Sequence, residues 1–326
     1  MLAGSGGLNP PPQNLIDFIN EGSVFLVAGH REPDGDCIGS QLALASFLKR
    51  MGKEAILCSA GPFKRSEVKQ YEELFCSAPN IEGKVIVVDC SLIDRTGELE
   101  PFLDGLPIAI IDHHRSNNNT GGFVNSAYIE PAAPSTTVLI MKLIKAMGLE
   151  PSREEAEYMF LGLCTDTGFF RHVDSDGADT FEYAAAMIHS GANPKVTYQA
   201  IYGGKSLSSR KLLGRVLSRI ESFYGGKLVI STEEFEETCI FGQEGRDSDS
   251  YYQLLQTVSD VEAIVIIRQE TLEKCTIGFR SRSWVDVRTI AEALGGGGHK
   301  HAAGCSISGT IPEIKTRIIK AFESVF

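Results

Sequence analysis

The sequence predicts an α/β protein with an N-terminal parallel-sheet domain and a smaller α/β domain with a mixed sheet. In the N-terminal part, short apolar runs alternate with segments of helical periodicity, which is the pattern of a parallel sheet. Nearer the C-terminus, only a short turn joins two apolar runs, which favours an antiparallel pair. Several N-terminal runs end in Asp or His. Since ligands bind beyond the carboxyl ends of parallel strands, these polar residues predict a functional site.

Composition places the chain among ordinary globular proteins and excludes two classes of function. Its 326 residues suffice for two domains, and 43% of them are hydrophobic and 22% charged. No apolar run approaches the roughly 18 residues of a membrane-spanning helix. The net charge of −11 argues against a protein that grips long duplex nucleic acid through many phosphates. A small phosphorylated ligand, held by a few local cations or by metals, is compatible with this charge.

The N-terminus and the cysteines bear on the cellular compartment. Residues 1–12 are rich in Gly and Pro and lack the basic and apolar regions of a signal peptide, so we expect a disordered leader. The eight cysteines form no C-x-x-C pair and no zinc-finger spacing, which is typical of a reduced protein. We therefore expect a cytoplasmic protein in which Cys37, Cys90 and Cys164 are small core residues.

The N-terminal domain is expected to span residues 13–204. Strands are predicted at its short apolar runs, 24–30, 55–59, 84–89 and 107–111. Helices are predicted from apolar periodicity and from cap and stop residues, at 38–51, 135–147, 152–164, 177–190 and 194–202. Ser135 is the expected cap of the second of these helices, and Ser152 with Glu155 forms a capping box for the third.

The C-terminal domain is expected to span residues 223–326, after a basic linker helix at 205–222. Its strands are predicted at 227–231, 262–269, 274–282 and 302–308. Helices are predicted at 248–258 and 286–294. Thr310 and Glu313 form a capping box that begins the last helix.

The loop after the first apolar run carries His30, Asp34 and Asp36. A polar turn with an incidental histidine is one explanation, because Pro-Asp-Gly is good turn chemistry. The two aspartates, however, flank a glycine between a buried strand and a helix. Their charges repel unless a cation lies between them, which favours a metal site.

Three further groups of polar residues follow apolar segments. Asp89 ends the third apolar run, where a helix cap is the simpler alternative. The triplet Asp112-His113-His114 ends the fourth run, and three consecutive polar residues there need partners such as a metal or a phosphate. One histidine suits a metal, and a nearby carboxylate commonly fixes the tautomer of such a ligand. Asp166 follows an apolar helix, where it also fits as the cap of the next element.

Together these residues predict a metal centre at one edge of the sheet. Oxygen ligands with a minority of imidazoles suit manganese or magnesium better than structural zinc, which favours cysteine. The ligands are numerous enough for two divalent ions. Two ions about 3.5–4 Å apart are a common arrangement for displacement at phosphorus. We expect Mn²⁺, with Mg²⁺ as the alternative.

The C-terminal domain carries a predicted anion site. It consists of Arg280, Ser281 and Arg282 together with Gly296, Gly297, Gly298 and His299. Arginines can form paired hydrogen bonds to phosphate oxygens, and successive glycines let backbone N–H groups converge on an anion. A flexible turn is the alternative, although four consecutive glycines from residue 295 cost much chain entropy for a turn alone.

Five motifs identify a family that the sequence resembles. They are His30-Arg-Glu-Pro-Asp-Gly-Asp36-x-x-Gly-Ser, Val-Asp89 with Arg95, Asp112-His-His, Thr165-Asp-Thr-Gly-x-Phe-Arg171 and Gly295-Gly-Gly-Gly-His-x-x-Ala-Ala-Gly304. In this combination the sequence resembles the DHH phosphoesterase superfamily, in the RecJ-like subfamily with a DHH-associated C-terminal domain. The likeness is greatest to nanoRNase-type oligoribonucleases that also act on adenosine 3′,5′-bisphosphate (pAp). It covers nearly the whole chain after the leader.

The resemblance implies a role for each site residue. It implies that His30, Asp34 and Asp89 hold one metal ion. Asp36, Asp89, His113 and Asp166 hold the other, so that Asp89 bridges the two. His114 faces the scissile phosphate, and Asp112 orients the histidines. Arg280, Ser281, Gly297 and His299 match substrate-binding positions, although Arg282 leaves open which arginine contacts the substrate.

We therefore expect a metal-dependent phosphodiesterase or phosphatase that acts on short oligonucleotides (nanoRNA) or on pAp. Attack by a hydroxide that bridges the two metals is the expected mechanism. The second domain would hold a terminal phosphate, with the substrate in a cleft between the domains. The expected partners are short single-stranded RNA or DNA and phosphorylated nucleotides, with no long duplex and no membrane. The oligomeric state is open, a homodimer being one arrangement.

Three alternative functions remain open at this point. The same metals could serve a phosphodiesterase of cyclic or linear dinucleotides such as cyclic di-AMP and pApA. An inorganic pyrophosphatase with a DHH motif is the second alternative, which the Gly295–Gly304 stretch disfavours because pyrophosphate needs no nucleotide-sized cleft. An inactive nucleotide-binding regulator is the third, and the complete set of ligand residues argues against it.

Overall fold

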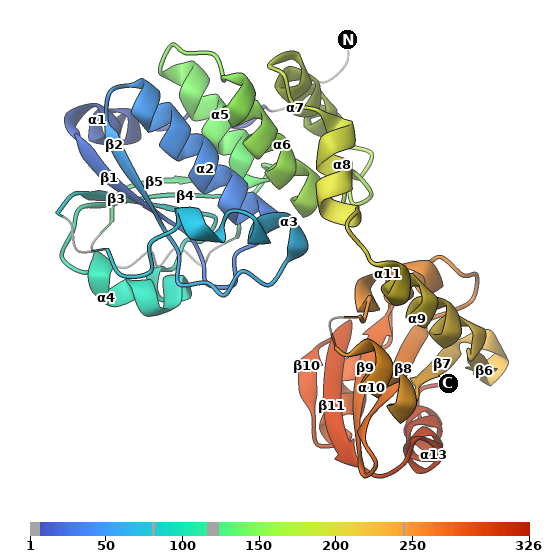
Figure 1. Ribbon diagram of the computed structural model, residues 1–326. Helices are drawn as coiled ribbons and strands as arrows, with labels where there is room; N and C mark the ends of the chain where they lie inside the picture. The colour runs from blue at the N-terminus through green and yellow to red at the C-terminus, as the bar shows by residue number, and fades with distance from the viewer. Residues whose placement is uncertain (1–6, 80–81, 116–123, 244) are drawn as a thin grey trace. The chain divides into compact units, whose positions relative to one another are not determined.

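The computed structural model describes residues 7–79, 82–115, 124–243 and 245–326 (Figure 1). The chain divides into two compact units, of which the first ends at Gly204 and the second begins at Lys205. Each unit contains its own sheet and its own buried apolar clusters. Each is therefore a domain with a core of its own.

The sheet of the first unit is parallel, with strand order β2-β1-β3-β4-β5. Its strands are β1 Val24–Ala28, β2 Glu54–Cys58, β3 Lys84–Val88, β4 Ile108–Asp112 and β5 Val124–Ile129. The first four lie within two residues of the apolar runs that predict them. The sequence does not reveal β5, because Asn125 and Ser126 interrupt its apolar pattern and alternate residues of it are exposed.

The helices of the first unit pack against this sheet or against one another. They are α1 Gln13–Glu21, α2 Gly35–Arg50, α3 Ser66–Lys69, α4 Glu100–Leu103, α5 Thr136–Ala146, α6 Arg153–Asp166, α7 Ala178–His189 and α8 Pro194–Tyr202, with 3-10 helices η1 Glu72–Leu74 and η2 Ile93–Leu99. Helix α2 begins earlier than its apolar periodicity predicts. Asp34 caps it, because its carboxylate accepts hydrogen bonds from the backbone N–H groups of Asp36 and Cys37 at 3.1 Å. Helix α6 begins with the predicted capping box of Ser152 and Glu155.

Both faces of the central strands are buried. On one face, Phe25 and Val27 of β1 join a large apolar cluster with α1, α2, α5 and α6. On the other face, Leu26 and Ala28 join a smaller cluster that contains Leu99. Figure 1 shows α2, α5 and α6 over one face of the sheet and α4 on the other. Strands buried on both faces read as continuous apolar runs, which is why β1, β3 and β4 are visible in the sequence.

The second unit has a mixed six-stranded sheet with the order β10-β11-β9-β8-β7-β6. Its strands are β6 Glu221–Phe223, β7 Leu228–Glu233, β8 Ala263–Thr271, β9 Lys274–Ser281, β10 Gly297–His299 and β11 Ala302–Ser308. Strands β7 and β8 are parallel and the other neighbours are antiparallel. The predicted antiparallel pair and the predicted fold class, a parallel sheet followed by a smaller domain with a mixed sheet, are thus confirmed.

Helices lie on both faces of the second sheet. They are α9 Leu207–Ser218, α10 Phe235–Phe241, α11 Ser248–Gln256, α12 Val287–Ala293 and α13 Ile311–Phe322, with the 3-10 helix η3 Tyr224–Gly226. Helix α9 lies within the stretch predicted as a linker. Its Leu212 and Val216 pack in one cluster with Ile264 of β8 and with α11. Helices α12 and α13 pack on the other face, where Phe279 of β9 is buried.

The stretch predicted as a leader lies only partly within the described residues, because residues 1–6 are outside them. Pro11 is buried, and the backbone carbonyl of Asn9 accepts a hydrogen bond from the Tyr128 hydroxyl at 2.7 Å. The Asn9 side chain donates to Glu130 at 2.6 Å. Residues 9–11 thus contact the first unit. In the described part of the chain, no helix combines the length and the apolar character needed to span a bilayer.

Candidate metal centre and phosphate-binding face

The polar residues that follow the apolar runs come together at the carboxyl edge of the first sheet. His30 lies two residues beyond β1, Asp89 directly follows β3, and Asp112 is the last residue of β4. Because β1, β3 and β4 are neighbours and parallel, their carboxyl ends meet at one edge. Helix α2 begins there beside Asp34, and α6 ends there with Asp166.

A first donor group consists of His30, Asp34 and Asp89. His30 Nε2 lies 3.4 Å from Asp89 Oδ2 and 3.8 Å from Asp34 Oδ1. His30 Nδ1 lies 2.9 Å from the carbonyl oxygen of Arg31, which can only accept, so Nδ1 carries the hydrogen. This leaves Nε2 to face the carboxylates. The Cys37 thiol, predicted as a core residue, lies here too, with its sulfur within 4.8 Å of donor atoms of His30 and Asp89.

A second donor group consists of Asp36, Asp89, His113 and Asp166. His113 Nε2 lies 3.3 Å from Asp166 Oδ2 and 3.8 Å from oxygens of both Asp36 and Asp89. Its Nδ1 lies 3.1 Å from the Ala133 carbonyl oxygen, which fixes the tautomer. Within the described ranges, Nε2 is buried and has no hydrogen-bond partner. Asp89 thus belongs to both donor groups.

The beginning of α5 holds two of the carboxylates in place. Backbone N–H groups of Thr136 and Thr137 donate to Asp36 at 2.7 and 3.0 Å, and the Thr136 hydroxyl donates to Asp89 Oδ1 at 3.0 Å. Ser135 occupies the predicted N-cap position, but its hydroxyl pairs with that of Thr137 instead of capping the helix. Asp36 therefore takes the role of the cap from another element. The sequence cannot show this, because α5 begins 100 residues after Asp36.

The backbone of Asp89 is in the left-handed region, with φ of 61°. A residue other than glycine rarely adopts this conformation, and such strain concentrates at functional sites. Here it lets the side chain turn from the strand end toward both donor groups, where it is only 2% exposed.

The electrostatics of the donor groups fit a bound cation. In the parts of the chain that the structure covers, no Lys or Arg lies within ion-pair distance of Asp36, Asp89 or Asp166. Burial raises the pKa of Asp166 to about 6, and the nearby carboxylates of Asp89 and Asp34 add to the rise while His113 opposes it. Burial, with the charges of Asp89 and Asp166, also raises the pKa of Asp36. Among the described residues these carboxylates have no Lys or Arg partner and surround a buried imidazole nitrogen without a hydrogen-bond partner, an arrangement that divalent metal ions satisfy.

Asp112 and His114 form a separate pair beside the second donor group. Asp112 is fully buried, and its Oδ1 accepts from the His114 backbone N–H at 3.1 Å and lies 2.8 Å from His114 Nδ1. This hydrogen bond raises the pKa of His114, whose side chain is 44% exposed. The pair thus presents an oriented, partly exposed imidazole 3.6 Å from Asp89.

In the second unit, Arg280 lies on a strand face made of small residues. Strand β9 buries alternate side chains, and Gly278 and Arg280 point to the other face. Their partners on β11 are Gly304 and Ala302. The Arg280 guanidinium carbon lies 4.6 Å from the centroid of the Tyr252 ring. The Tyr252 hydroxyl lies over Gly278, where a Cβ would be 2.2 Å from it, so the glycine makes room for this ring. An arginine oriented by an aromatic ring suits a phosphate or another anion.

Ser281 and Arg282 are placed differently from Arg280. The Ser281 hydroxyl is buried, donates to the Val285 carbonyl at 2.7 Å and lies 2.9 Å from His301 Nδ1. The structure therefore does not bring it together with Arg280. Alternation along β9 is the sequence signal for this, because Ser281 continues the buried series of that strand. Arg282 is exposed in the loop after β9.

Close packing of the chain explains two of the glycines before His299, Gly296 and Gly298. Gly297–His299 form β10, which pairs with β11. A Cβ on Gly296 would lie 2.2 Å from the Gly304 carbonyl oxygen, and Gly298, with φ of 143°, would place one 2.6 Å from the Ala302 carbonyl oxygen. Gly297 has open space beside it, and His299 is exposed. Of the four predicted anion-binding residues here, Gly297 and His299 are therefore open to a ligand.

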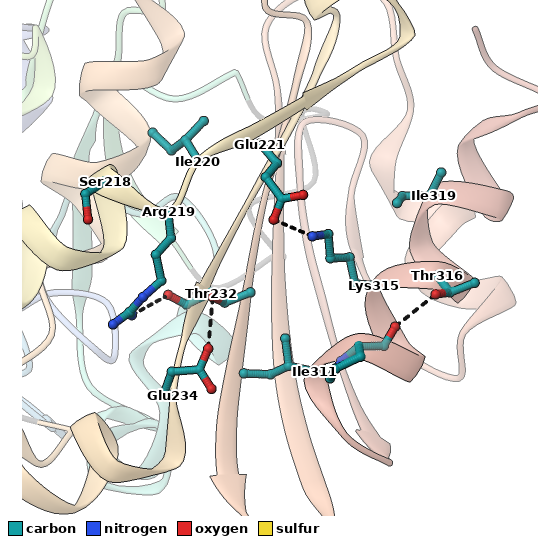
Figure 2. A pocket seen from close by; sticks show the side chains of 11 residues that line it. Ser218, Arg219, Ile220, Glu221, Thr232, Glu234, Ile311, Lys315, Thr316 and Ile319 are labelled. Atoms are coloured by element: carbon teal, nitrogen blue, oxygen red, sulfur yellow. Dashed lines mark hydrogen bonds and ion pairs between the residues drawn. The ribbon is translucent and has the colours of Figure 1, made fainter.

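A cavity of about 610 Å³ lies elsewhere in the second unit, next to the edge strand β6 (Figure 2). Its two cations are already paired, Lys315 with Glu221 and Arg219 with Glu237. It contains none of the residues that the sequence predicts as a site. The donor groups and the Arg280 face thus remain the features that carry chemistry.

Comparison with known families gives two matches along the chain. Residues 24–163 match the DHH family, N-terminal domain, and residues 237–326 match the DHHA1 domain. The first match contains His30, Asp34, Asp36, Asp89, Asp112, His113 and His114. The second contains Arg280 and the glycines before His299.

Comparison with individual proteins agrees with these matches. The chain is 30% identical over 303 residues to the bifunctional oligoribonuclease and PAP phosphatase NrnA of Thermus thermophilus, which covers 92% of this chain and 89% of that protein. A crystal structure of an exopolyphosphatase-related protein from Bacteroides fragilis superposes with a TM-score of 0.75 at 22% identity, over 96% of this chain and 95% of the other. RecJ from Thermus thermophilus in complex with Mn²⁺ gives a TM-score of 0.52 at 17% identity, over 98% of this chain and 56% of the other.

Proposed function

Since the chain belongs to the DHH family, we propose that it hydrolyses short oligoribonucleotides and pAp as a metal-dependent phosphoesterase. The observation that carries this proposal is the pair of donor groups that share Asp89, in a chain similar over nearly its whole length to an oligoribonuclease and PAP phosphatase. Two adjacent groups of hard ligands are suited to displacement at phosphorus.

The first donor group would hold one divalent ion and the second the other. Bound there, the ions would lower the pKa of a water molecule and neutralise charge on the transferring phosphoryl group. Manganese is favoured by the mixture of carboxylates and imidazoles, and RecJ, a structural neighbour, is known in complex with Mn²⁺. Burial raises the pKa of the Cys37 thiol to about 11, so it stays protonated and we assign it no ligand role.

His114 would donate a hydrogen bond to the substrate phosphate. Its Nδ1 is held by Asp112, and this bond raises its pKa, so that the imidazole is protonated over a wider pH range. A cationic donor beside the phosphate stabilises the negative charge that the transition state carries. Asp112 acts as a positioning residue, because the hydrogen bonds of its carboxylate to described residues all go to His114.

Arg280 is the arginine that we assign to the substrate phosphate. The Tyr252 ring and the Phe279 carbonyl, which accepts from Arg280 Nη1 at 3.0 Å, orient its guanidinium beside Gly278 and Ala302. R280A should raise the KM for a dinucleotide about tenfold, because a charge-assisted hydrogen bond contributes about 1.5–3 kcal/mol. The matched variant R282A should change it little. A small chromogenic phosphodiester, which has no terminal phosphate, should be hydrolysed equally well by both.

The proposed function is tested by a turnover panel with Mn²⁺. The substrates are a labelled RNA dimer, a labelled RNA 24-mer, pAp, cyclic di-AMP and pyrophosphate. We expect fast hydrolysis of the dimer and of pAp, and slow hydrolysis of the rest. Exclusive turnover of cyclic di-AMP or of pyrophosphate would replace the proposed substrate, and no turnover of any of the five would favour a regulator.

A further inference from the structure

Six aromatic side chains of the first unit form a cluster that reaches from the core to the surface. They are Phe160, Phe169, Phe170, Phe181, Tyr198 and Tyr202, here called the aromatic cluster. Phe160 is 1% exposed, whereas Tyr198 and Phe181 are each 53% exposed. Isolated exposed rings are ordinary on a protein surface, but a connected group of them indicates a binding site.

The backbone that presents the cluster is unusual. Gly168, Phe169 and Phe170 are three successive left-handed residues, with φ of 58°, 56° and 70°. Phenylalanine rarely adopts this conformation, and strain of this kind is characteristic of functional segments. The segment begins two residues after Asp166, the last residue of α6 and a member of the second donor group. The cluster is therefore continuous in the chain with the metal centre.

Helix α8 completes the exposed part of the cluster. It packs against α6, and Figure 1 shows the two helices side by side. The Tyr198 ring lies 5.3 Å from that of Phe169 and 4.9 Å from that of Tyr202, measured between centroids. Tyr198 meets Phe169 at 86°, so this contact takes only an edge of one ring, and more than half of the Tyr198 side chain is exposed.

A cation stands beside these rings. Arg171 is exposed and follows Phe170 directly, and no carboxylate lies within ion-pair distance of it in the described segments. It is close enough to Tyr202 for its charge to oppose the rise that burial causes in the pKa of that phenol. Its Nη2 lies 3.2 Å from His172 Nε2, and the guanidinium carries its charge without a described carboxylate beside it. Aromatic rings next to such an arginine are the chemistry that recognises a nucleotide, with the base on the ring and the phosphate on the cation.

We propose that Tyr198, supported by Phe169 and Tyr202, is a stacking platform for a nucleobase of the substrate. This inference rests on the proposed function and adds a specificity-determining residue to it. Stacking on a ring is tolerant of sequence, since every base has a π-face, and it would serve an enzyme for oligonucleotides of any sequence. The occupant is the substrate itself, because the segment that carries Phe169 also carries Asp166.

The test compares variants on two substrates with Mn²⁺. The variants are Y198A, Y198F, and F102A as a matched control that removes an exposed ring from α4. The substrates are a 5′-phosphorylated diadenylate and the same molecule with both bases removed. Y198A should raise the KM for the diadenylate about tenfold and leave the abasic compound unchanged, since stacking is worth about 1–3 kcal/mol per base. Y198F and F102A should behave as the wild type. Equal effects of Y198A on both substrates, or none on either, would overturn the platform.

A binding measurement separates the platform from the proposed function. Adenosine 5′-monophosphate and ribose 5-phosphate are titrated into the wild type and Y198A by calorimetry, without turnover. Tighter binding of the nucleotide by the wild type alone supports the platform, even for a protein that hydrolyses no dinucleotide. Equal affinities for both compounds, or a preference that Y198A retains, would refute it. If a second copy of the chain covers Tyr198, the two compounds should bind with equal affinity, and this result would also refute the platform.

Discussion

Each unit contains a cluster of carboxylates, but the surroundings of the two clusters are opposite. In the first unit, Asp36, Asp89 and Asp166 crowd around His113 without a Lys or Arg within ion-pair distance in the described residues. In the second unit, Arg246 lies between Glu233 and Glu270, with contacts of 2.7 to 3.1 Å to their oxygens, and Arg219 contacts both oxygens of Glu237. One group of acids lacks cations, and the other is neutralised.

The pKa values of the two groups move in opposite directions. Burial raises the pKa of Asp36 and Asp166, and neighbouring acids add to the rise. Burial also acts on Glu237 and Glu270, but hydrogen bonds from Arg219 and Arg246 outweigh it and lower their pKa. Carboxylates that repel one another lower the stability of the fold, and such groups are typical of functional sites. The acids of the first unit therefore indicate a functional site, and those of the second unit a structural network.

The largest expected effect comes from removing the carboxylate that the two donor groups share. D89N should lower Mn²⁺-dependent kcat by about 10³-fold or more, because a charged ligand is lost from both sites. Asparagine tolerates the left-handed backbone and can still accept from Thr136, so the fold should survive. Steady-state kinetics on the RNA dimer measure the loss, and metal titration measures the affinity.

The matched control for this variant is D94N, which changes an exposed aspartate of η2. It should retain wild-type kcat. In EDTA, D89N should be at least as stable as the wild type, because a charge that repels Asp36 and Asp166 is gone. Turnover by D89N within tenfold of the wild type would refute the shared-ligand role.

The second effect tests the neutralised acids of the other unit. R246A should lower the free energy of unfolding by about 3–5 kcal/mol, since it leaves the partly buried Glu270 without its ion-pair partner and the buried Glu233 with Arg268 alone. R288A, which breaks an exposed pair with Asp286, should cost less than about 1 kcal/mol. Urea denaturation followed by circular dichroism gives both values. Similar losses for the two variants would show that the buried network is no stronger than a surface pair.

Much of the fold is predictable because burial leaves a mark on the sequence. Strands β1, β3 and β4 are buried on both faces and are visible as apolar runs, each leading to a site residue. Strand β5 escapes prediction because Asn125 and Ser126 interrupt its apolar pattern and alternate residues of it are exposed. The three-residue strands β6 and β10 are too short for any periodicity to appear.

The candidate site is predictable in its residue types and less so in its supports. Asp89 and the Asp112-His113-His114 triplet are predicted as site residues because they stand at the ends of apolar runs, where polar residues need partners. The hydrogen bonds from α5 to Asp36 join residues 100 positions apart, and the left-handed backbone of Asp89 has no signature in a single sequence. Gly298 is a residue that the sequence predicts for the wrong reason. Close strand packing requires a glycine there, and in a sequence such a glycine cannot be distinguished from one that binds an anion.

The third effect is a pH dependence of the metal-free protein. The pKa of Asp166 is about 6 in the fold, above its ordinary value, so the folded protein binds more protons than the unfolded chain between about pH 4 and 6. Stability in EDTA should therefore fall by about 1–2 kcal/mol as the pH rises through this window. Thermal melts from pH 4.5 to 8 measure the trend.

Added Mn²⁺ and the variant D166N both test the origin of this pH dependence of stability. Excess Mn²⁺ should reverse it, because the ion binds the deprotonated carboxylates of the folded state. D166N should reduce the slope in EDTA, because one of the two acids with a raised pKa is gone. An EDTA profile that rises through pH 6 in the wild type would contradict the cation-free description of the donor groups.

The smallest expected effect concerns Glu262, a buried acid of the second unit that has no Lys, Arg or His within ion-pair distance in the described part of the chain. Its carboxylate accepts from the backbone N–H groups of Ser283, Trp284 and Val285 at 2.7–3.0 Å and from the Ser283 hydroxyl at 2.7 Å. Although burial acts to raise the pKa of Glu262, these donors lower it. E262Q should cost about 1–2 kcal/mol at pH 7, because an amide replaces one acceptor oxygen with a donor. Exposed Glu273 provides the control variant, E273Q, which should be neutral.

Comparison of Glu262 with Asp36 also shows why the pKa values of the acids shift in opposite directions in the two units. Asp36 likewise accepts two backbone N–H bonds and has no Lys or Arg partner among the described residues, yet burial raises its pKa, and the charges of Asp89 and Asp166 beside it add to the rise. A group with a lowered pKa stabilises the fold above its unfolded pKa, about 4.5 for glutamate, and loses this contribution as the pH falls through its folded pKa. The stability gap between wild type and E262Q should therefore close below about pH 4.5. A gap that persists at pH 3 would show that E262Q lowers the free energy of unfolding through packing. The comparison would then give no support to charge repulsion as the cause of the difference between the pKa values of Glu262 and Asp36.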